Sequence, residues 1–508
     1  MDRAVRISLE HSIRSRVLRG SVVALACALG LALAPSASAQ AASPRRVVFV
    51  RADAPAGGDG GSWDRALTSL DQALAQHPGA SIWIARGSYR PSSAGSALDD
   101  GTARSWTFEV PAATSLHGGF RGDESSLEER PHPITGTVLS GDLPETPTNA
   151  RGDDCFSVVT IAPGADAVVL DGLEIRDGWA MEIQHPDGRS RGAGISAANV
   201  GQLFLTDCAV TDNRAARAGA GLDFLGAQLL VRQCTFEGNL VGGNVAAGTW
   251  AHGGGACITV SGGAPSSRIH STVFRNNIVS AELGGSGQQQ QRGGGLYFGD
   301  LQTGLGAFGA TSDASLELAN CVFILNFAPQ GGAVAVQASA PVSGVQLRSC
   351  TLVRNVATNL YPAWSGNGNA LSFEYGGVEN ALWNTVAWNN LGSPQTVPIH
   401  VRSGPPILAE HSNLQPQATP AWVSNTGTVL QLDPLFVDLA GEDVRLQATS
   451  PLLDLGSNAA VPRDALDLDR DGWRWEHLPW SIVPGEPRIA PSTPQAPPIV
   501  DLGALERS

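Results

Sequence analysis

The chain has 508 residues, of which only 16% are charged, and a formal net charge of −14 at pH 7. It contains 60 glycines and no lysine, so all 33 basic residues are arginine. This composition favours strands, turns and loops over helical bundles. An acidic, lysine-free surface also argues against nucleic acid and anionic membranes as partners.

The N-terminus has the order of a secretory signal peptide. Basic residues up to Arg19 precede an apolar run at residues 22–34, and the small-residue motif Ala37-Ser38-Ala39 follows. We therefore expect residues 1–39 to be a signal peptide that is cleaved after Ala39. The apolar run is short for a membrane span, and no later segment is apolar enough to cross a membrane. The expected location is secreted or extracytoplasmic, in the periplasm or at the cell surface, with no transmembrane segment after signal removal.

Residues 40–110 predict an N-terminal cap. A strand is followed by an amphipathic, helix-like segment at Leu67–Gln76 and by a second strand at Ser81–Ala85. Such a unit would cover the open end of a stack of strands and prevent edge-to-edge association.

Two short elements alternate between residues 165 and 390. The first is a small residue, an apolar residue two positions later, and an asparagine three positions after that. The second is a glycine-rich turn followed by a small or apolar residue. Copies of the first begin at Cys208, Cys234, Thr272, Cys321, Cys350 and Asn384 and end at Asn213, Asn239, Asn277, Asn326, Asn355 and Asn389. Copies of the second begin at Gly192, Gly219, Gly253, Gly293 and Gly331.

Alternating stretches such as Ser315-Leu-Glu-Leu318 link these elements and indicate strands with one buried face. Each copy is a strand–turn–strand unit that cannot bury its own face, so copies must stack into parallel sheets around a continuous core. We predict an all-β, right-handed parallel β-helix, a single-stranded solenoid, over residues 111–400. A short helix lies in its N-terminal cap, and residues 401–508 form an irregular C-terminal capping region that closes the other end.

The repeats also predict what fills the interior. The small residue and the apolar residue two positions later point inward, while the asparagines lie at corners, tolerate left-handed backbone and form a ladder. Six cysteines follow residue 39, and four of them share the small-residue position. This pattern favours a column of buried free thiols over disulfide bridges, although an exported chain could oxidise them.

These motifs carry a family resemblance. Glycine-rich elements such as Gly331-Gly332-Ala333-Val334, paired with Phe-x-x-Asn elements, resemble the repeats of right-handed β-helix surface proteins, including the chlamydial polymorphic outer-membrane proteins. The segments at Ile82–Pro91, Leu116–Glu124, Asp433–Asp438 and Asp501–Glu506 resemble a bacterial family of secreted, pectin-lyase-like β-helix proteins with a choice-of-anchor-type C-terminal region. The resemblance implies the fold and assigns no activity.

Gly152-Asp153-Asp154-Cys155 is identical to a motif of polygalacturonase-type β-helix hydrolases. Paired carboxylates can act as acid and base in glycoside hydrolysis, so Asp153 and Asp154 are the catalytic candidates. The companion motifs of that family are missing, which favours an ordinary turn. The absence of lysine rules out a lysine base of the kind some β-helix lyases use.

Asp467-Leu-Asp469-Arg-Asp471-Gly472 has the opening of a calcium loop, with carboxylates on alternate residues and glycine at the bend. The closing acid is absent, because Leu478 occupies its position, but Glu476 could substitute. The interpretations are a structural Ca²⁺ on the three aspartates or an Asp-rich turn. The neighbouring Trp473, Trp475 and Trp480 could stack on sugar rings or pack the segment onto the solenoid.

The function expected from these observations is an exported, non-catalytic, monomeric β-helix that binds glycans or cell-surface partners along its solenoid face. A polysaccharide lyase or glycoside hydrolase acting on acidic polysaccharide is one alternative, and a structural envelope component is another. No cofactor is expected apart from the candidate calcium.

Overall fold

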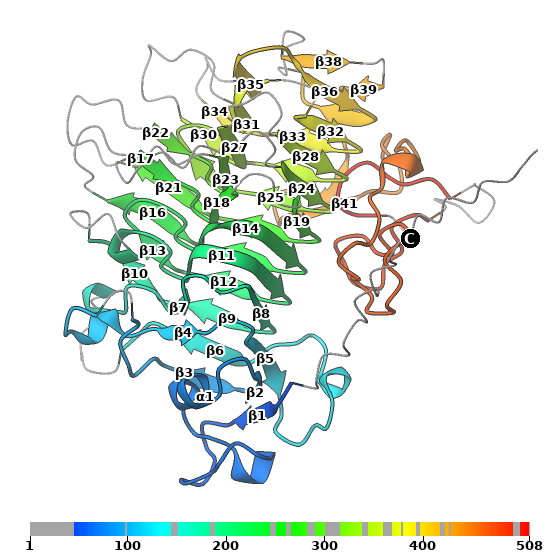
Figure 1. Ribbon diagram of the computed structural model, residues 1–508. Coiled ribbons are helices and arrows are strands. Elements are labelled where there is room, and N and C mark those ends of the chain that lie inside the picture. Colours follow the sequence, from blue (N-terminus) through cyan, green and yellow to red (C-terminus); the bar gives the residue numbers. More distant parts are fainter. Residues whose placement is uncertain are drawn as a thin grey trace, which may run out of the picture. The chain divides into compact units, whose positions relative to one another are not determined.

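The chain folds as a right-handed parallel β-helix, which confirms the fold that the repeats predict (Figure 1). The computed structural model describes residues 45–96, 99–143, 151–182, 188–243, 250–260, 266–281, 290–299, 315–337, 344–358, 368–376, 379–392, 397–416, 422–425, 428–490 and 498–506. The expected signal peptide, residues 1–39, lies outside these ranges. In the described residues no helix is long and apolar enough to cross a membrane.

Three parallel sheets run along the solenoid, and we number them I to III. Sheet I contains β1 (Val47–Val50), β2 (Ser81–Ala85), β4 (Phe108–Val110), β5 (Ser115–Phe120), β7 (Val159–Ile161), β8 (Ala167–Asp171), β11 (Ile195–Thr206), β14 (Leu222–Arg232), β18 (Ala256–Val260), β19 (Ser267–His270), β23 (Leu296–Gly299), β24 (Ser315–Ala319), β27 (Val334–Gln337), β28 (Gly344–Arg348), β31 (Gly368–Tyr375), β32 (Ala381–Trp383), β35 (Val397–Ser403), β36 (Ile407–Glu410) and β38 (Val423–Asn425).

Sheet II contains β3 (Gly87–Tyr89), β6 (Thr137–Ser140), β9 (Glu174–Arg176), β12 (Ala209–Thr211), β15 (Thr235–Glu237), β20 (Val273–Arg275), β25 (Val322–Ile324), β29 (Thr351–Val353), β33 (Val386–Trp388), β37 (Ser412–Leu414) and β39 (Val429–Leu430). Sheet III contains β10 (Trp179–Ala180), β13 (Arg214–Ala215), β16 (Leu240–Gly243), β21 (Ile278–Ala281), β26 (Phe327–Ala328), β30 (Val356–Ala357) and β34 (Leu391–Gly392).

Smaller elements complete the described part. A parallel pair joins β17 (Trp250–His252) and β22 (Gln290–Arg292), and an antiparallel pair joins β40 (Phe436–Asp438) and β41 (Asp443–Leu446). The helix α1 (Leu70–Gln76) lies at the N-terminal end of the stack (Figure 1). One-turn 3₁₀ helices are η1 (Trp63–Arg65), η2 (Ala103–Ser105), η3 (Leu127–Glu129), η4 (Arg151–Asp153), η5 (Gly188–Ser190) and η6 (Asn458–Ala460).

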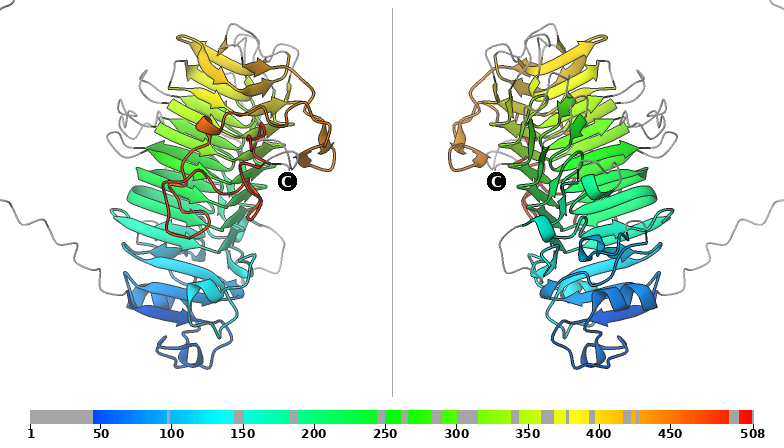
Figure 2. Two further views of the ribbon diagram at one scale, coloured as in Figure 1. Left: turned by 90° about the vertical axis from the view of Figure 1, so that its right-hand side faces the viewer. Right: turned by 90° about the vertical axis from the view of Figure 1, so that its left-hand side faces the viewer.

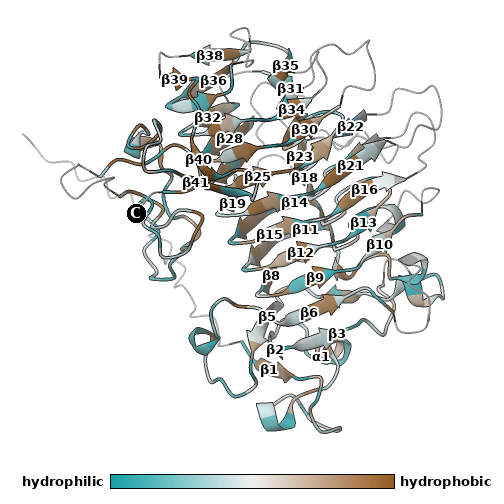
Figure 3. Ribbon diagram, turned by 180° about the vertical axis from the view of Figure 1, so that it is seen from behind, coloured by the Kyte–Doolittle hydropathy of each residue, from teal (hydrophilic) through white to brown (hydrophobic). Residues whose placement is uncertain are grey.

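The coils in the middle of the stack pass through the sheets in the same order, as the coil from β18 to β22 illustrates. Strands β18 and β19 pair side by side with the two halves of the long strand β14 in sheet I. The chain then enters β20 in sheet II and β21 in sheet III, and β22 leads to the glycine turn before β23. In Figure 2 the coils follow one another along the axis in chain order. Figure 3 shows that most strands are coloured hydrophobic, because their inward residues form the core.

A ladder of asparagines fills the corner between sheets II and III. Asn239 donates through Nδ2 to Oδ1 of Asn277 at 3.0 Å, and Asn277 donates to Asn326 over the same distance. The ladder begins at Asn213, continues through Asn355 and Asn390, and ends at the amide of Gln415. Because each amide also bonds backbone groups, the corner stays satisfied although the side chains are fully buried.

Two details of the predicted repeat are wrong. The left-handed residue is the one before the ladder asparagine, for example Asn276 with φ of 56°, and not the asparagine itself. The last copy is also out of register by one position, because β29 pairs with β33 through Thr351 and Val386. The ladder residue there is therefore Asn390, and Asn389 is exposed at the turn.

The interior columns follow the prediction. The six cysteines are buried and free, and Cys208 and Cys234 lie in neighbouring coils at the same position. Two positions after the small residue of their repeats, Phe236, Phe274 and Phe323 stack with ring centroids 4.9 and 4.7 Å apart. Burial raises the pKa of the Cys234 and Cys321 thiols well above the usual value, which keeps them protonated and unreactive.

The N-terminal and C-terminal parts of the chain pack differently against the stack of coils. At the N-terminus α1 buries Leu70, Ala73 and Leu74 in the core, and Ser69 caps it by accepting from the amide of Gln72. At the other end only the part through β39 continues the coils. Residues 433–490 and 498–506, which we call the return segment, do not close the end of the stack as expected but run back along its flank (Figure 2).

Candidate functional site

The return segment binds the corner between sheets I and II. In successive coils this corner is formed by one residue with left-handed backbone, a conformation that short polar residues tolerate. Its side chain points away from the core and is free to bond a partner. The column of these residues is Asp207, Gln233, Ser271, Asn320, Ser349 and Asn384, with φ between 48° and 54°.

Three members of this column contact the return segment directly. Arg470 donates to the carboxylate of Asp207 at 2.6 Å. Asn320 donates to the carbonyl of Trp480 at 2.8 Å. Asn384 exchanges two hydrogen bonds with the backbone of Ser457, at 3.0 and 2.8 Å. The corner is therefore a row of anchoring positions for a segment that lies far away in the sequence.

A cavity of about 820 Å³ lies between the corner and the return segment. Its inner wall is the stack, from Asp207–Ala209 through Gln233–Thr235 to Ser271 and Val273. Residues 132–135 form a second wall. The return segment supplies the outer wall with Leu468, Asp469, Arg470, Trp480, Ile482 and Pro484. Apolar surface with a few convergent polar groups is the usual make-up of a ligand site.

A charged cluster lies at the end of the cavity where Arg470 reaches the stack. Arg470 lies 3.9 Å from Asp171 as well as 2.6 Å from Asp207. Asp171 accepts from Arg130 at 2.7 Å and contacts His117 at 2.8 Å. Burial alone would raise the pKa of Asp171, but His117 and Arg130 outweigh it and lower the pKa to about 2. Burial raises the pKa of Asp207, and the nearby Asp171 adds to this although Arg470 opposes it.

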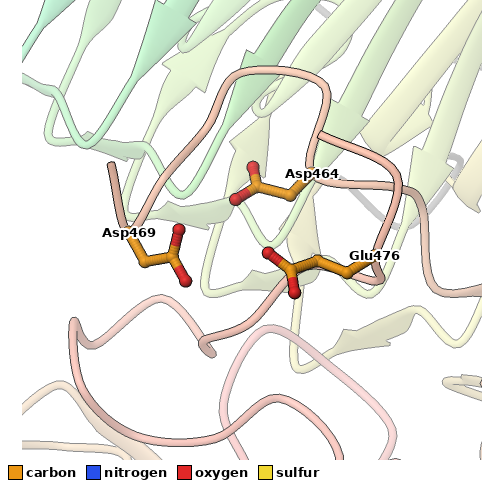
Figure 4. A group of neighbouring side chains, drawn as sticks. All are labelled: Asp464, Asp469 and Glu476. Atoms are coloured by element: carbon orange, nitrogen blue, oxygen red, sulfur yellow. The ribbon is translucent and has the colours of Figure 1, made fainter. Parts of the chain in front are cut away.

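A group of carboxylates lies on the return segment (Figure 4). Asp464, Asp469 and Glu476 each place an oxygen within 4.8 Å of the others, and Asp467, Asp469 and Asp471 do the same. Asp469 belongs to both groups and also lines the cavity. The three ligands predicted from the sequence therefore lie close together. The structure adds Asp464, which precedes Asp467 by three residues and is not part of the calcium-loop motif.

The three tryptophans do not act as one surface. Trp473 and Trp475 are 64% and 75% exposed, so their rings lie in solvent. Trp480 is half-buried and lines the cavity. The candidate for sugar stacking inside the cavity is therefore Trp480.

Asp153 and Asp154, the catalytic candidates, lie elsewhere. Asp153 ends η4 ahead of β7, and Asp154 is buried, with its carbonyl accepting from Arg104. Neither lines the cavity. Their role as acid and base stays an untested prediction.

The residues at the charged cluster were not found from the sequence. Asp171, Asp207 and Arg130 come from three different coils or loops, and Arg470 is supplied from the return segment. No local spacing connects them, so only the three-dimensional contact reveals the site.

The chain was compared with protein families, curated proteins and solved structures. No family model and no curated protein matches the chain. A solved structure described as that of the pectate lyase Pel9A aligns over 92% of this chain and 97% of its own, with 13% identity and a TM-score of 0.47. That likeness is too weak to carry an argument about function. The parallel pairing within its own three sheets shows that the chain is a parallel β-helix.

Proposed function

We propose that the protein is an exported β-helix that binds carbohydrate without turning it over, in the cavity between the corner and the return segment. The observation that carries this proposal is the cavity itself. It combines a tryptophan and other apolar walls with an ion pair and with amide and hydroxyl groups.

The chemistry of the lining suits a sugar. A pyranose ring offers an apolar face that packs on an aromatic ring and a rim of hydroxyls that need polar partners. Trp480 supplies the aromatic surface, while Asp207 and Gln233 supply acceptors and donors. The hydroxyl of Ser271 is buried and has no partner in the described part of the chain, so a ligand hydroxyl could bond it.

This proposal moves the binding site from the solenoid face, where the sequence placed it, to the flank. A cavity of about 820 Å³ falls within the usual range of ligand sites and accommodates a short oligosaccharide rather than a long polymer face. Export is part of the proposal and rests on the signal-like residues 1–39.

A glycan array followed by calorimetry tests the proposal. Trp480→Ala and Ser271→Ala are expected to weaken binding of the best glycan, about tenfold for the tryptophan. Trp475→Ala, which removes an exposed ring outside the cavity, is the matched control and leaves affinity unchanged. An array that stays blank at micromolar protein contradicts the proposal.

One observation favours a second candidate, a lyase or hydrolase of acidic polysaccharide. Two carboxylates, Asp207 and Asp469, and the guanidinium of Arg470 all line the same cavity. Arg470, however, pairs with Asp207 and opposes protonation of that carboxylate, although burial raises its pKa overall. Release of reducing ends or unsaturated products from pectin or alginate, abolished by Asp207→Asn, would establish this candidate instead.

A further inference from the structure

The carboxylate group on the return segment sits in a closed loop. Residues 464–476 leave and re-enter the segment at the same place, where the amide of Asp464 donates to the carbonyl of Glu476 at 2.9 Å. A second bond of 2.9 Å joins the amide of Leu478 to the carbonyl of Pro462. Asp464 and Glu476 therefore face each other at the base of the loop, and Asp469 approaches from its far side (Figure 4).

Asp464 is the residue that points to a ligand. It is completely buried, and only one of its carboxylate oxygens has a partner, since Oδ2 accepts from the amide of Leu468 at 2.8 Å. Its Oδ1 is buried without a hydrogen bond within the described residues. Figure 4 shows this carboxylate directed toward Asp469 and Glu476. A buried carboxylate oxygen with no donor is costly and calls for a cation or a proton.

Glu476, on the other side of the loop, also has a buried carboxylate oxygen, Oε1, without a hydrogen-bond partner in the described residues. None of the three carboxylates forms an ion pair there. Arg463, beside Asp464 in sequence, instead donates to the carbonyl of Trp475. Burial raises the pKa of Asp464 to about 6, and the charges of Asp469 and Asp467 add to the effect.

Asp467 and Asp471, which belong to the group predicted from the sequence, already accept hydrogen bonds from backbone amides. One oxygen of Asp467 accepts from the amide of Gly472 at 3.1 Å, and one of Asp471 accepts from the amide of Trp473 at 2.6 Å. Asp471 is exposed to solvent. These bonds shape the tight turn, with Asp467 and Arg470 in left-handed backbone at φ of 56° and 61°. The Asp-x-Asp-x-Asp-Gly pattern therefore builds the turn, while the buried oxygens that have no partner in the described residues, Oδ1 of Asp464 and Oε1 of Glu476, lie in the other group.

We propose that Asp464, Asp469 and Glu476 bind one Ca²⁺ ion inside the loop. Three carboxylates are hard oxygen donors of the kind that Ca²⁺ prefers, and water can fill the remaining positions on the half-exposed side of the group. Three ligands from separate turns of an irregular loop suit the variable geometry of Ca²⁺ better than the strict octahedron of Mg²⁺. This site does not depend on carbohydrate binding.

The ion would tie the return segment to the stack. Asp469 lies between Leu468, which forms a wall of the cavity, and Arg470, which pairs with Asp207. An ion that fixes Asp469 to both ends of the loop also fixes its two neighbours. Ca²⁺ therefore holds the outer wall of the cavity in place.

Direct binding to the mature protein tests the proposal. After chelator treatment, Ca²⁺ is titrated by calorimetry, and Tb³⁺ luminescence excited through the nearby tryptophans reports the same site independently. Asp464→Asn and Glu476→Gln are each expected to weaken Ca²⁺ binding about tenfold or more. Asp471→Asn, which alters only the turn-forming group, is the matched control and changes affinity by less than about threefold. Far-ultraviolet circular dichroism checks that each variant is folded, and Glu476→Gln, at a half-buried position, serves if Asp464→Asn does not fold.

Four results overturn the proposal. Wild-type protein that binds neither Ca²⁺ nor Tb³⁺ excludes the site. Loss of binding in Asp471→Asn but not in Glu476→Gln places the ion in the sequence-predicted group. Equal loss in all three variants shows that one ion draws on both groups. Tighter binding of Mg²⁺ than of Ca²⁺ would reject the choice of metal.

Discussion

The guanidinium of Arg470 lies 2.6 Å from the carboxylate of Asp207, although the two residues are 263 positions apart in the sequence. This contact joins the return segment to the corner of an early coil. Both side chains are partly shielded, at 33% and 21% exposed, so the pair is stronger than a fully solvated one.

The contact predicts an energetic coupling that a double-mutant cycle can measure. Arg470→Gln and Asp207→Asn should each destabilise the protein, with a coupling free energy of about 1 kcal/mol. Each should also speed proteolysis of the return segment. The matched control is Arg121 with Asp123, a pair outside the return segment whose side chains are 57% and 74% exposed, for which little coupling is expected. Additive effects at Arg470 and Asp207 would show that the contact does not hold the segment.

The asparagine ladder predicts a large loss of stability on truncation of one rung. Asn277→Ala removes the donor to the carbonyl of Phe236 and the acceptor of Asn239, and it leaves both groups buried. We expect the free energy of unfolding to fall by about 2–4 kcal/mol in denaturant titrations. Asn276→Gly is the control, because Asn276 is exposed and its φ of 56° suits glycine. Equal effects of the two changes would contradict a role for the ladder.

The coils approach so closely at the glycine turns that we expect no room there for a Cβ atom. A Cβ on Gly255 would lie 2.5 Å from the carbonyl oxygen of Gly295 in the next coil and 3.1 Å from Cγ of Asn277. Gly255→Ala should therefore cost about 3 kcal/mol of stability or prevent folding. Gly152→Ala, where a Cβ would meet nothing within 4 Å, should change the melting temperature little. A melting temperature unchanged by Gly255→Ala would mean that the coils can separate locally.

We expect the buried imidazole of His400 to make the protein less stable in mild acid. Burial lowers its pKa from 6.5 to about 4, with Glu374 opposing the shift and Arg402 adding to it. Since the pKa is lower in the folded than in the unfolded chain, this contribution is complete above pH 6.5 and is lost as the pH falls toward 4. Allowing for solvent screening, the wild type should lose about 2 kcal/mol over this window relative to His400→Gln. Unfolding curves of the two proteins that stay parallel from pH 7 to pH 4 would contradict the prediction.

The stack could be predicted because its signals are local. Each coil repeats the same inward residues, so Phe236, Phe274 and Phe323 can be aligned without knowing the structure. The register error at the last copy has a physical cause. Val386 resembles a core residue, but it faces outward and is buried by the return segment.

The sequence carries a signal for this covering. Outward positions of sheet II are polar in early coils, as Thr235 and Glu237 show, and become apolar in later coils. An apolar outer face on a solenoid indicates a partner surface. The apolar outward residues are Val322, Ile324, Val353 and Val386, and they pack on Phe436, Val444, Leu446, Leu452 and Leu502 of the return segment.

The candidate site was predictable only where its residues are close in sequence. The spacing of Asp467, Asp469 and Asp471 located the acidic loop, but it did not identify Asp464 as the buried member. The cavity could not be predicted, because it exists only where residues 468–485 meet coils that lie about 200 positions or more earlier in the sequence.

The path of the return segment has a consequence for the order of assembly. A chain is synthesised from its N-terminus, so the coils that carry Asp171 and Asp207 can stack while residue 470 is still to be made. The cavity wall arrives last, through contacts whose long sequence separation makes them slow to form. The cavity is therefore complete only after residues 468–485 have been made, and a chain that lacks the return segment would present a solenoid with an open, apolar flank.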